Sequence, residues 1–283
     1  IVTGDWSSDV CSSDLPESGF SPAPGNNTQR DYNPGVLNQE IWVRRIVNSG
    51  SCRNESPILY IPIADENIWT GSENANWNNP ANWSCRILPT LQTDVKIPTN
   101  LASNNYPVIN LGNNGLVKNL TIENNATVEI NDILLRIAGS FASEGIVNTI
   151  NGAISFQGTS AQNLPAGALV NNRIKDLILN NPAGLSSEGT LELTGKLLLQ
   201  NGNFYTNDDF TLISDETQTA LIDGSGSGQV IGQVKMQRYL DNRFGYKFFS
   251  SPFQNSKVGD FEAFMDLSNP VTNFPHFYRY DEN

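Results

Sequence analysis

Short apolar runs separated by turns rich in Asn, Gly and Ser fill the chain from Tyr106 to Gln237. None of these runs keeps a 3.6-residue apolar period over ten or more residues, which an amphipathic helix would need. Short runs bounded by turn residues are typical of strands, so the chain is expected to adopt an all-β fold. The clearest runs are 119–122, 127–130, 133–138, 153–156, 176–179, 190–193, 196–199, 210–213 and 233–236.

An internal repeat narrows the choice of all-β architectures. Val117–Asn124 reads VKNLTIEN and Ile174–Asn181 reads IKDLILNN, an offset of 57 residues, and ILLRIAG at 133–139 lies near LELTG at 191–195 on the same offset. Such repeats predict a parallel β-helix or solenoid, in which each coil buries the apolar face of its neighbour. The repeat is longer than one coil and is expected to span two or three. An antiparallel β-sandwich would use the same short strands and turns, and it stays open as the alternative.

The Asn content supports a fold with many tight turns. The chain of 283 residues contains 37 Asn. Asn tolerates the left-handed backbone conformation and bonds to its own backbone in turns. In a solenoid, aligned Asn side chains can also form ladders of amide hydrogen bonds. We therefore expect Asn at the corners of stacked coils.

The charge balance excludes several classes of protein. The chain has 29 acidic and 17 basic side chains, a net charge of −12, and no basic run. A chain of this charge is not expected to bind nucleic acid. No apolar run approaches the roughly 20 residues of a membrane-spanning helix, so no membrane insertion is expected from this chain. With His276 as the single His, a multi-His metal site is excluded, and we predict no metal and no cofactor.

Catalytic motifs are missing from the sequence. No Ser lies in a G-x-S-x-G elbow, no phosphate-binding loop occurs, and a catalytic triad would have to use His276. Some polysaccharide lyases and hydrolases are β-helices whose sites use paired carboxylates or Ca²⁺-binding Asp. Asp208 and Asp209 are the candidates for such a carboxylate pair. They either bind Ca²⁺ together or lie in a solvated turn. We predict that the chain is not an enzyme and has no catalytic residues.

Residues 5–15 have an unusual origin. They read DWSSDVCSSDL and match, over eleven consecutive residues, the translation of a common short-read sequencing adapter. We therefore expect residues 1–15 to be adapter-derived and set them aside from fold reasoning. The chain is expected to be a fragment that is open at both ends.

Residues 16–63 end in a hairpin signal. QEIWVRRIV at 39–47 and PILYIPI at 57–63 are rich in β-branched and aromatic residues, with a polar turn between them. The segment resembles the final strands of immunoglobulin-like repeats in large bacterial surface proteins, which implies a truncated Ig-like domain followed by a linker at 64–67. Cys52 lies in this segment; it could pair with Cys85 or with a residue outside the chain. The residues that carry the resemblance are Arg44, Arg45, Val47, Ser49, Gly50, Cys52 and Ser56.

Residues 68–98 hold the most distinctive motif. Trp69, Trp77 and Trp83 are spaced by eight and six residues, among Gly and Asn-Pro turns. The pattern W-x-G, N-W-N, N-W-S, P-T, D-V-x-I-P resembles the opening of β-helical domains in secreted bacterial adhesins. A solenoid must cover the open end of its first coil, and large rings suit that purpose. The alternative is that Trp69, Trp77 and Trp83 form a platform that stacks on a glycan.

The pattern changes again near residue 234. Arg238, Tyr239 and the Ser250–Pro252 stretch resemble the junction at which a β-sandwich follows such solenoids. The expected organisation is a solenoid at 68–233 and the start of a truncated β-sandwich at 234–283. The whole resembles the repeat-rich exoproteins of gliding bacteria that use type IX secretion. This implies a non-catalytic structural or adhesive module that is secreted or on the cell surface, with extracellular glycans or other surface proteins as partners. A glycan-binding module, or a non-catalytic part of a carbohydrate-active enzyme, is the alternative.

Overall fold

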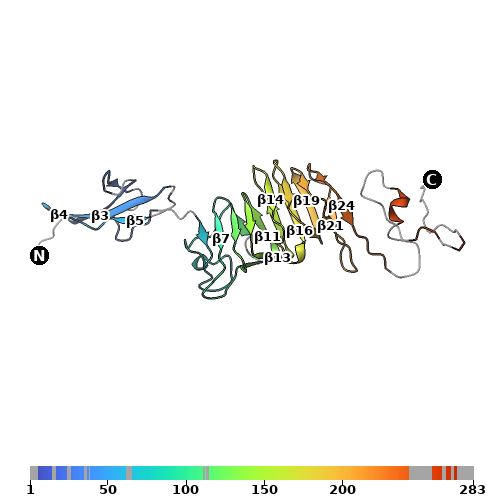
Figure 1. Cartoon of the computed structure of the whole chain (residues 1–283). Helices are drawn as coiled ribbons and strands as arrows, with labels where there is room; N and C mark the ends of the chain where they lie inside the picture. Colours follow the sequence, from blue (N-terminus) through green and yellow to red (C-terminus); the bar gives the residue numbers. More distant parts are fainter. Residues whose placement is uncertain are drawn as a thin grey trace. The chain divides into compact units, whose positions relative to one another are not determined.

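A computed structural model gives the fold of the chain (Figure 1). The predicted all-β class is confirmed: the described elements are strands and three short 3₁₀ turns, η1 (Pro80–Asn82), η2 (Val170–Asn172) and η3 (Val258–Phe261). The residues that the structure describes are 6–14, 17–23, 27–34, 37, 39–61, 66–110, 112, 115–241, 257–262, 266–268 and 271–272.

Residues 67–236 form a parallel β-solenoid of about seven turns, which confirms the predicted solenoid over the antiparallel sandwich. Figure 1 shows its coils stacked in sequence order, from the cyan β7 to the orange β24. Every strand pair within it is parallel, and each strand bonds to the equivalent strand one coil later. Each coil contributes up to three strands, which build three faces that we number in chain order.

Face 1 opens each coil. Its strands have two or three residues each, so only one or two side chains of each strand point inward. The two four-stranded sheets of this face meet where β12 lies against β14. Its strands are β6 (Asn67–Ile68), β7 (Val95–Ile97), β10 (Leu120–Ile122), β12 (Phe141–Ser143), β14 (Gln162–Leu164), β17 (Leu185–Ser187), β20 (Phe204–Tyr205) and β23 (Val230–Ile231).

Faces 2 and 3 complete the coil. The two long strands β11 (Thr127–Ile137) and β13 (Ile146–Phe156) run through both faces and change register at the corner between them. Face 2 also contains β8 (Val108–Ile109), β15 (Arg173–Ile174), β18 (Leu191–Leu193), β21 (Phe210–Leu212) and β24 (Val234–Met236). Face 3 also contains β9 (Gly115–Val117), β16 (Asp176–Asn180), β19 (Lys196–Asn201) and β22 (Leu221–Asp223).

The core is a set of apolar columns inside the coil stack. Strands such as β16 and β18 alternate between buried and half-buried positions, because successive side chains of a strand point to opposite sides. Identical positions then stack from coil to coil, so each column stays apolar along its length. One face 3 column consists of Leu135, Ile154, Leu177 and Leu197, all with no exposed surface.

The internal repeat corresponds to a corner motif. Asn119 accepts a hydrogen bond from the backbone N–H of Ser140 in the next coil, at 2.7 Å, and Asp176 accepts one from the N–H of Lys196, at 2.6 Å. The residue before each donor is a glycine, and neither glycine has room for a side chain. A Cβ on Gly195 would lie 2.7 Å from the carbonyl oxygen of residue 175. Each repeat unit is thus a polar side chain over a glycine corner.

The offset of 57 residues has a geometric reason. Leu120 pairs with Phe141, 21 residues later, so 57 residues amount to about two and two-thirds coils. Leu120 therefore lies on face 1, whereas its repeat partner Leu177 lies on face 3. The predicted span of two or three coils is confirmed, but the repeat relates two different corners rather than one corner of successive coils.

Asn and Asp supply most of the left-handed turn residues, as the composition predicts. Among the described residues other than glycine, seven of the eight with positive φ are Asn or Asp; Arg86 is the eighth. The expected amide ladder takes a mixed form, because Asn119 donates to Asp94 and the buried Asn181 donates to Gln162. Asn therefore acts mainly by its turn conformation.

A small antiparallel sheet precedes the solenoid. Its order is β2-β1-β3-β4, and β5 also pairs with β3. Its small core of Val10, Ala23 and Val43 lies on one side of the sheet. The second sheet of an Ig-like sandwich is not present in the described residues, so the Ig-like assignment stays a prediction. The strands are β1 (Trp6–Ser13), β2 (Ser21–Pro22), β3 (Ile41–Ser49), β4 (Cys52–Glu55) and β5 (Leu59–Ile61).

Two features of this sheet differ from the sequence analysis. The stretch that matches the adapter forms β1, which pairs with β3 from Trp6 to Ser13. Backbone pairing needs no particular side chains, and Val10 and Cys11 supply buried surface. The polar turn contains a strand of its own, β4, whose residues are all exposed and therefore carry no apolar pattern.

The solenoid boundaries shift slightly from those expected. Asn67 belongs to β6 and is buried, although it falls in the predicted linker. β24 belongs to face 2 and pairs with β21, although it falls in the predicted β-sandwich. Residues 240–283 form a separate unit, and most of the predicted sandwich start lies outside the described residues.

The glycine corner gives a stability prediction. We expect Gly195→Ala to lower the free energy of unfolding by about 1–3 kcal/mol, because the new methyl group meets the backbone and forces the corner apart. Gly224→Ala is the control, because nothing lies within 4 Å of a Cβ at Gly224. Urea unfolding followed by circular dichroism measures both. Equal stability of the two variants would contradict the corner motif.

Candidate functional site

The three Trp residues form one cluster at the first coil. Trp83 meets both other rings edge-on, with ring centroids 4.9 Å from Trp69 and 4.7 Å from Trp77. Trp69 and Trp77 are stacked, with centroids 6.3 Å apart. The exposed fractions of the three side chains are 0–1%. Edge-to-face packing of this kind adds to the energy of burial alone.

Two of the three indole N–H groups of the cluster donate to backbone carbonyls. The indole N–H of Trp69 donates to the carbonyl of Asn105 at 2.8 Å, and that of Trp83 donates to the carbonyl of Trp77 at 2.9 Å. Gly71 has φ +57°, and a Cβ there would collide with the carbonyl of Asn105. The glycine of the W-x-G motif is therefore required both by its backbone conformation and by this close approach.

A buried amide holds the loop that carries these rings. Asn82 has no exposed surface, and its side-chain oxygen accepts from the N–H groups of Glu73 and Asn74. Its side-chain nitrogen donates to the Asn74 side chain and to the carbonyl of Asn76, both at 2.9 Å. All hydrogen-bonding capacity of the amide is used, which offsets the cost of burying it.

This arrangement has the burial that the capping interpretation requires. Trp69, Trp77 and Trp83 belong to the same core cluster as Val95 and Ile97 of the next coil. Stacking on a sugar needs an exposed ring face, and these three rings have none in this structure. Glycan binding by the chain therefore stays a prediction, and its site must be sought on another surface.

The carboxylates of Asp208 and Asp209 are engaged within the protein. Asp208 has φ +57° in a turn, and its carboxylate accepts from the N–H of Gln233 at 2.8 Å. Asp209 accepts from the Thr190 hydroxyl and from the Lys235 ammonium group, which is 3.1 Å away. The turn that the sequence left open is present, and both carboxylates have protein partners rather than converging on one point.

The described residues contain no group of three or more His, Cys, Asp or Glu arranged for a metal ion. His276 lies outside the described residues. Cys52 is exposed, Cys85 is half-buried, and neither forms a disulfide in this structure. Within the described part of the chain, no helix has the length and hydrophobicity to cross a membrane.

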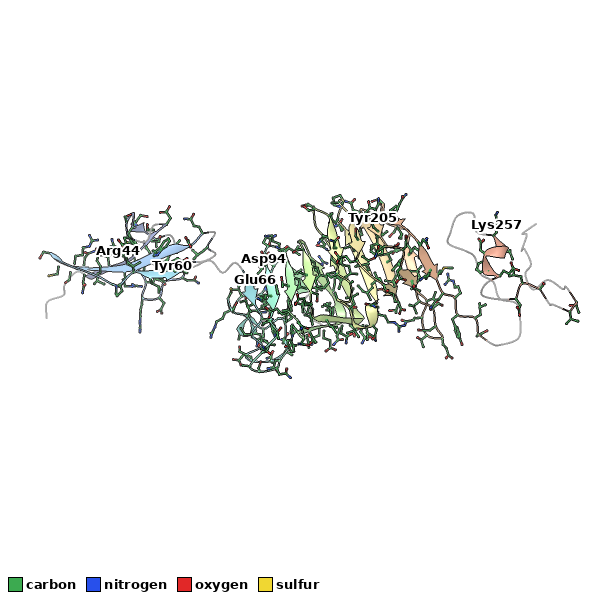
Figure 2. All side chains as sticks on the ribbon, viewed as in Figure 1. Arg44, Tyr60, Glu66, Asp94, Tyr205 and Lys257 are labelled. Atoms are coloured by element: carbon green, nitrogen blue, oxygen red, sulfur yellow. The ribbon has the colours of Figure 1, made fainter. Side chains whose placement is uncertain are left out.

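Two exposed surfaces were not singled out by the sequence. Tyr205 points out from face 1 with 43% of its surface exposed, and Figure 2 shows it on the outside of the coil stack. In the antiparallel sheet, Tyr60 is 46% exposed and its ring centroid is 4.9 Å from that of Trp42. Single aromatic residues in short strands give no sequence signal that separates them from core residues.

A comparison with protein families matches part of the solenoid. Residues 68–173 match a family described as "Domain of unknown function (DUF8693)". The match begins at the Trp cluster and ends at the first residue of β15, whereas the coils continue to β24. No curated protein and no solved structure matches the chain.

The Trp cluster gives a second prediction. We expect Trp77→Ala to lower the free energy of unfolding by about 3–5 kcal/mol, because it leaves a cavity at the end of the core. Tyr205→Ala, at an exposed ring, is the control and should change stability by about 0.5 kcal/mol or less. Thermal unfolding followed by circular dichroism checks both. An unchanged melting temperature for Trp77→Ala would contradict the capping role.

The acidic turns give a prediction about pH. Hydrogen bonds from the side chain and backbone of Thr217 lower the pKa of Asp215 to about 2. Bonds from Ser225 and Thr190 likewise lower the pKa values of Asp223 and Asp209. Because these pKa values are lower in the folded state, their stabilisation is present above pH about 4 and is lost as the pH falls toward 2.

We therefore expect a melting temperature that is nearly constant from pH 7 to about 5 and falls below about 4. Carboxyl NMR titration should place the Asp215 midpoint near 2 and move it upward in Thr217→Ala, which removes the hydroxyl donor. Glu216→Ala, at an exposed neighbour, serves as the control. An Asp215 midpoint near 4 in the unsubstituted chain would refute this assignment.

Proposed function

We propose that the chain is a non-catalytic structural module of a large secreted or cell-surface bacterial protein, in which the solenoid acts as a spacer. The observation that carries the proposal is the continuous core, which runs from the Trp cluster to Ala220 without a break. About seven coils with the parallel strand spacing of about 4.8 Å give a rod of about 34 Å. Such a rod keeps the regions before and after it apart.

Contacts between coils support a load-bearing role. Ion pairs link neighbouring coils on the outside, as in Lys96–Glu123 at 2.6 Å and Arg173–Glu192 at 2.6 Å. Each exposed pair adds only about 0.2–1 kcal/mol, but the backbone hydrogen bonds between coils add to them along the whole stack. The resemblance of residues 68–98 and 229–252 to gliding-bacterial exoproteins supports secretion by the type IX pathway and an adhesive context.

Glycan binding is the second candidate, and one observation favours it. The outward row of face 1 is uncharged over several coils and contains an exposed aromatic ring, that of Tyr205. Small polar side chains beside an aromatic ring are suited to contact a sugar. After the charged Lys96, the row consists of Thr121, Ala142, Asn163, Ser186, Tyr205 and Ile231.

Force spectroscopy on the full chain tests the spacer. We expect the antiparallel sheet to unfold at lower force than the solenoid, because its core contains only Val10, Ala23 and Val43. The solenoid should then unfold in steps of about 7 nm, the extended length of a coil of about 21 residues. A solenoid that extends before the antiparallel sheet would overturn the proposal.

A glycan array and a panel of polysaccharides separate the candidates. A spacer should bind no glycan and release no reducing ends. Binding that is lost in Tyr205→Ala and kept in Glu144→Ala, an exposed turn residue, would favour the glycan module. Polysaccharide cleavage by the purified chain would refute the non-catalytic assignment.

A further inference from the structure

The outward side of face 3 presents large apolar side chains among a few charged ones. Its central row carries one side chain from each of six successive strands. Five of these side chains are half-buried and one is buried, although the row points away from the core. From β9 to β22 the row reads Leu116, Arg136, Ser155, Ile178, Leu198 and Asp223.

Arg136 differs from most of the cations on the solenoid. Six of these cations form ion pairs with carboxylates of other coils, whereas Arg136 and Arg86 form no ion pair with any described residue. Its Nε atom is buried and has no hydrogen-bond partner. The guanidinium also has no counter-charge among the described residues, so a carboxylate added beside its outer nitrogen atoms would be favourable. The paired cations are Lys96, Lys118, Arg173, Lys175, Lys196 and Lys235.

The row is complementary to itself in size and charge. Ile178 on β16 is its fourth member, and Arg136 and Asp223 lie two strands to either side of it. Ser155, the smallest member, and Leu198, one of the largest, lie one strand to either side. A two-fold axis along β16 would place opposite charges together and a large side chain over a small one.

We propose that face 3 is a self-association surface, on which a second copy of this chain packs face to face with its solenoid axis reversed. Ile178 then meets Ile178 of the partner, Leu198 covers the partner's Ser155, and Arg136 pairs with the partner's Asp223. On the second outward row each Asp176 lies on the axis opposite the partner's Asp176, and the Lys196 of each copy, one strand away, supplies the opposite charge. An isologous contact of this kind repeats each interaction twice.

The size of the contact sets its strength. Five overlapping strands at about 4.8 Å spacing, with about four residues each, cover roughly 300 Å² per copy. This is well below the roughly 800 Å² per partner of a stable complex, so the dimer is weak. Weak pairing between two opposed arrays of a surface module gains strength from multivalency.

Sedimentation velocity on the full chain tests the proposal. Over about 10 to 500 µM, we expect a dimer fraction that rises with concentration, as a weak complex requires. Ile178→Glu should remain monomeric, because it places two carboxylates on the axis. Asn163→Glu, on the outward row of face 1, is the matched control and should dimerise like the unsubstituted chain.

Charge reversal keeps the test independent of folding. Arg136→Asp and Asp223→Arg should each weaken the dimer about tenfold, and the double variant should restore it. Circular dichroism confirms that each variant is folded. A monomer at all concentrations, or a dimer unaffected by Ile178→Glu in folded protein, overturns the proposal. Additive effects in the double variant overturn the pairing of Arg136 with Asp223.

Discussion

Every level of this structure depends on the backbone hydrogen bonds between neighbouring coils. A strand of two or three residues such as β18 or β20 makes too few bonds to exist alone, and each lies between two neighbouring strands that bond to it. The same requirement explains the buried columns, since a side chain in one coil is covered by its equivalents above and below. The first coil has no coil on its outer side, so its core needs another cover. The Trp69–Trp77–Trp83 cluster and the fully bonded Asn82 close that end.

Charge follows the same geometry. The exposed ion pairs of the solenoid join residues on different coils, so the acidic side chains that dominate the composition are partly used to connect the stack. Asp176 and Asn119 do so without a cation, by accepting a backbone N–H at a corner. Against this background Arg136 stands out, because its row on face 3 provides no carboxylate within reach.

The sequence predicts faces 2 and 3 better than face 1. Strands such as β16, β18 and β19 carry two or three apolar residues, and this pattern predicts them as strands. Face 1 strands such as β12, β14 and β17 carry an inward Ser or Gln beside a single large apolar residue. One apolar residue is too few to form the alternation by which a strand is predicted from sequence. The burial of the three Trp rings and the row around Ile178 depend on register between coils. Neither can be derived from spacing along one chain.

The corner motif determines which segments of the solenoid can be duplicated or deleted without loss of the fold. Leu120 lies on face 1 and Leu177 lies on face 3, although their local sequences are similar. The segment that can be exchanged between positions in the solenoid is therefore one face of a coil rather than one full coil. A duplication or deletion of the segment that forms one face would move every later segment to the next face, and a corner such as Asn119 with Gly139 or Asp176 with Gly195 would keep its polar acceptor and its glycine. Such chains can therefore lengthen by one third of a coil at a time. Each such step moves the later segments to another face of the solenoid, while their inward residues stay in the core.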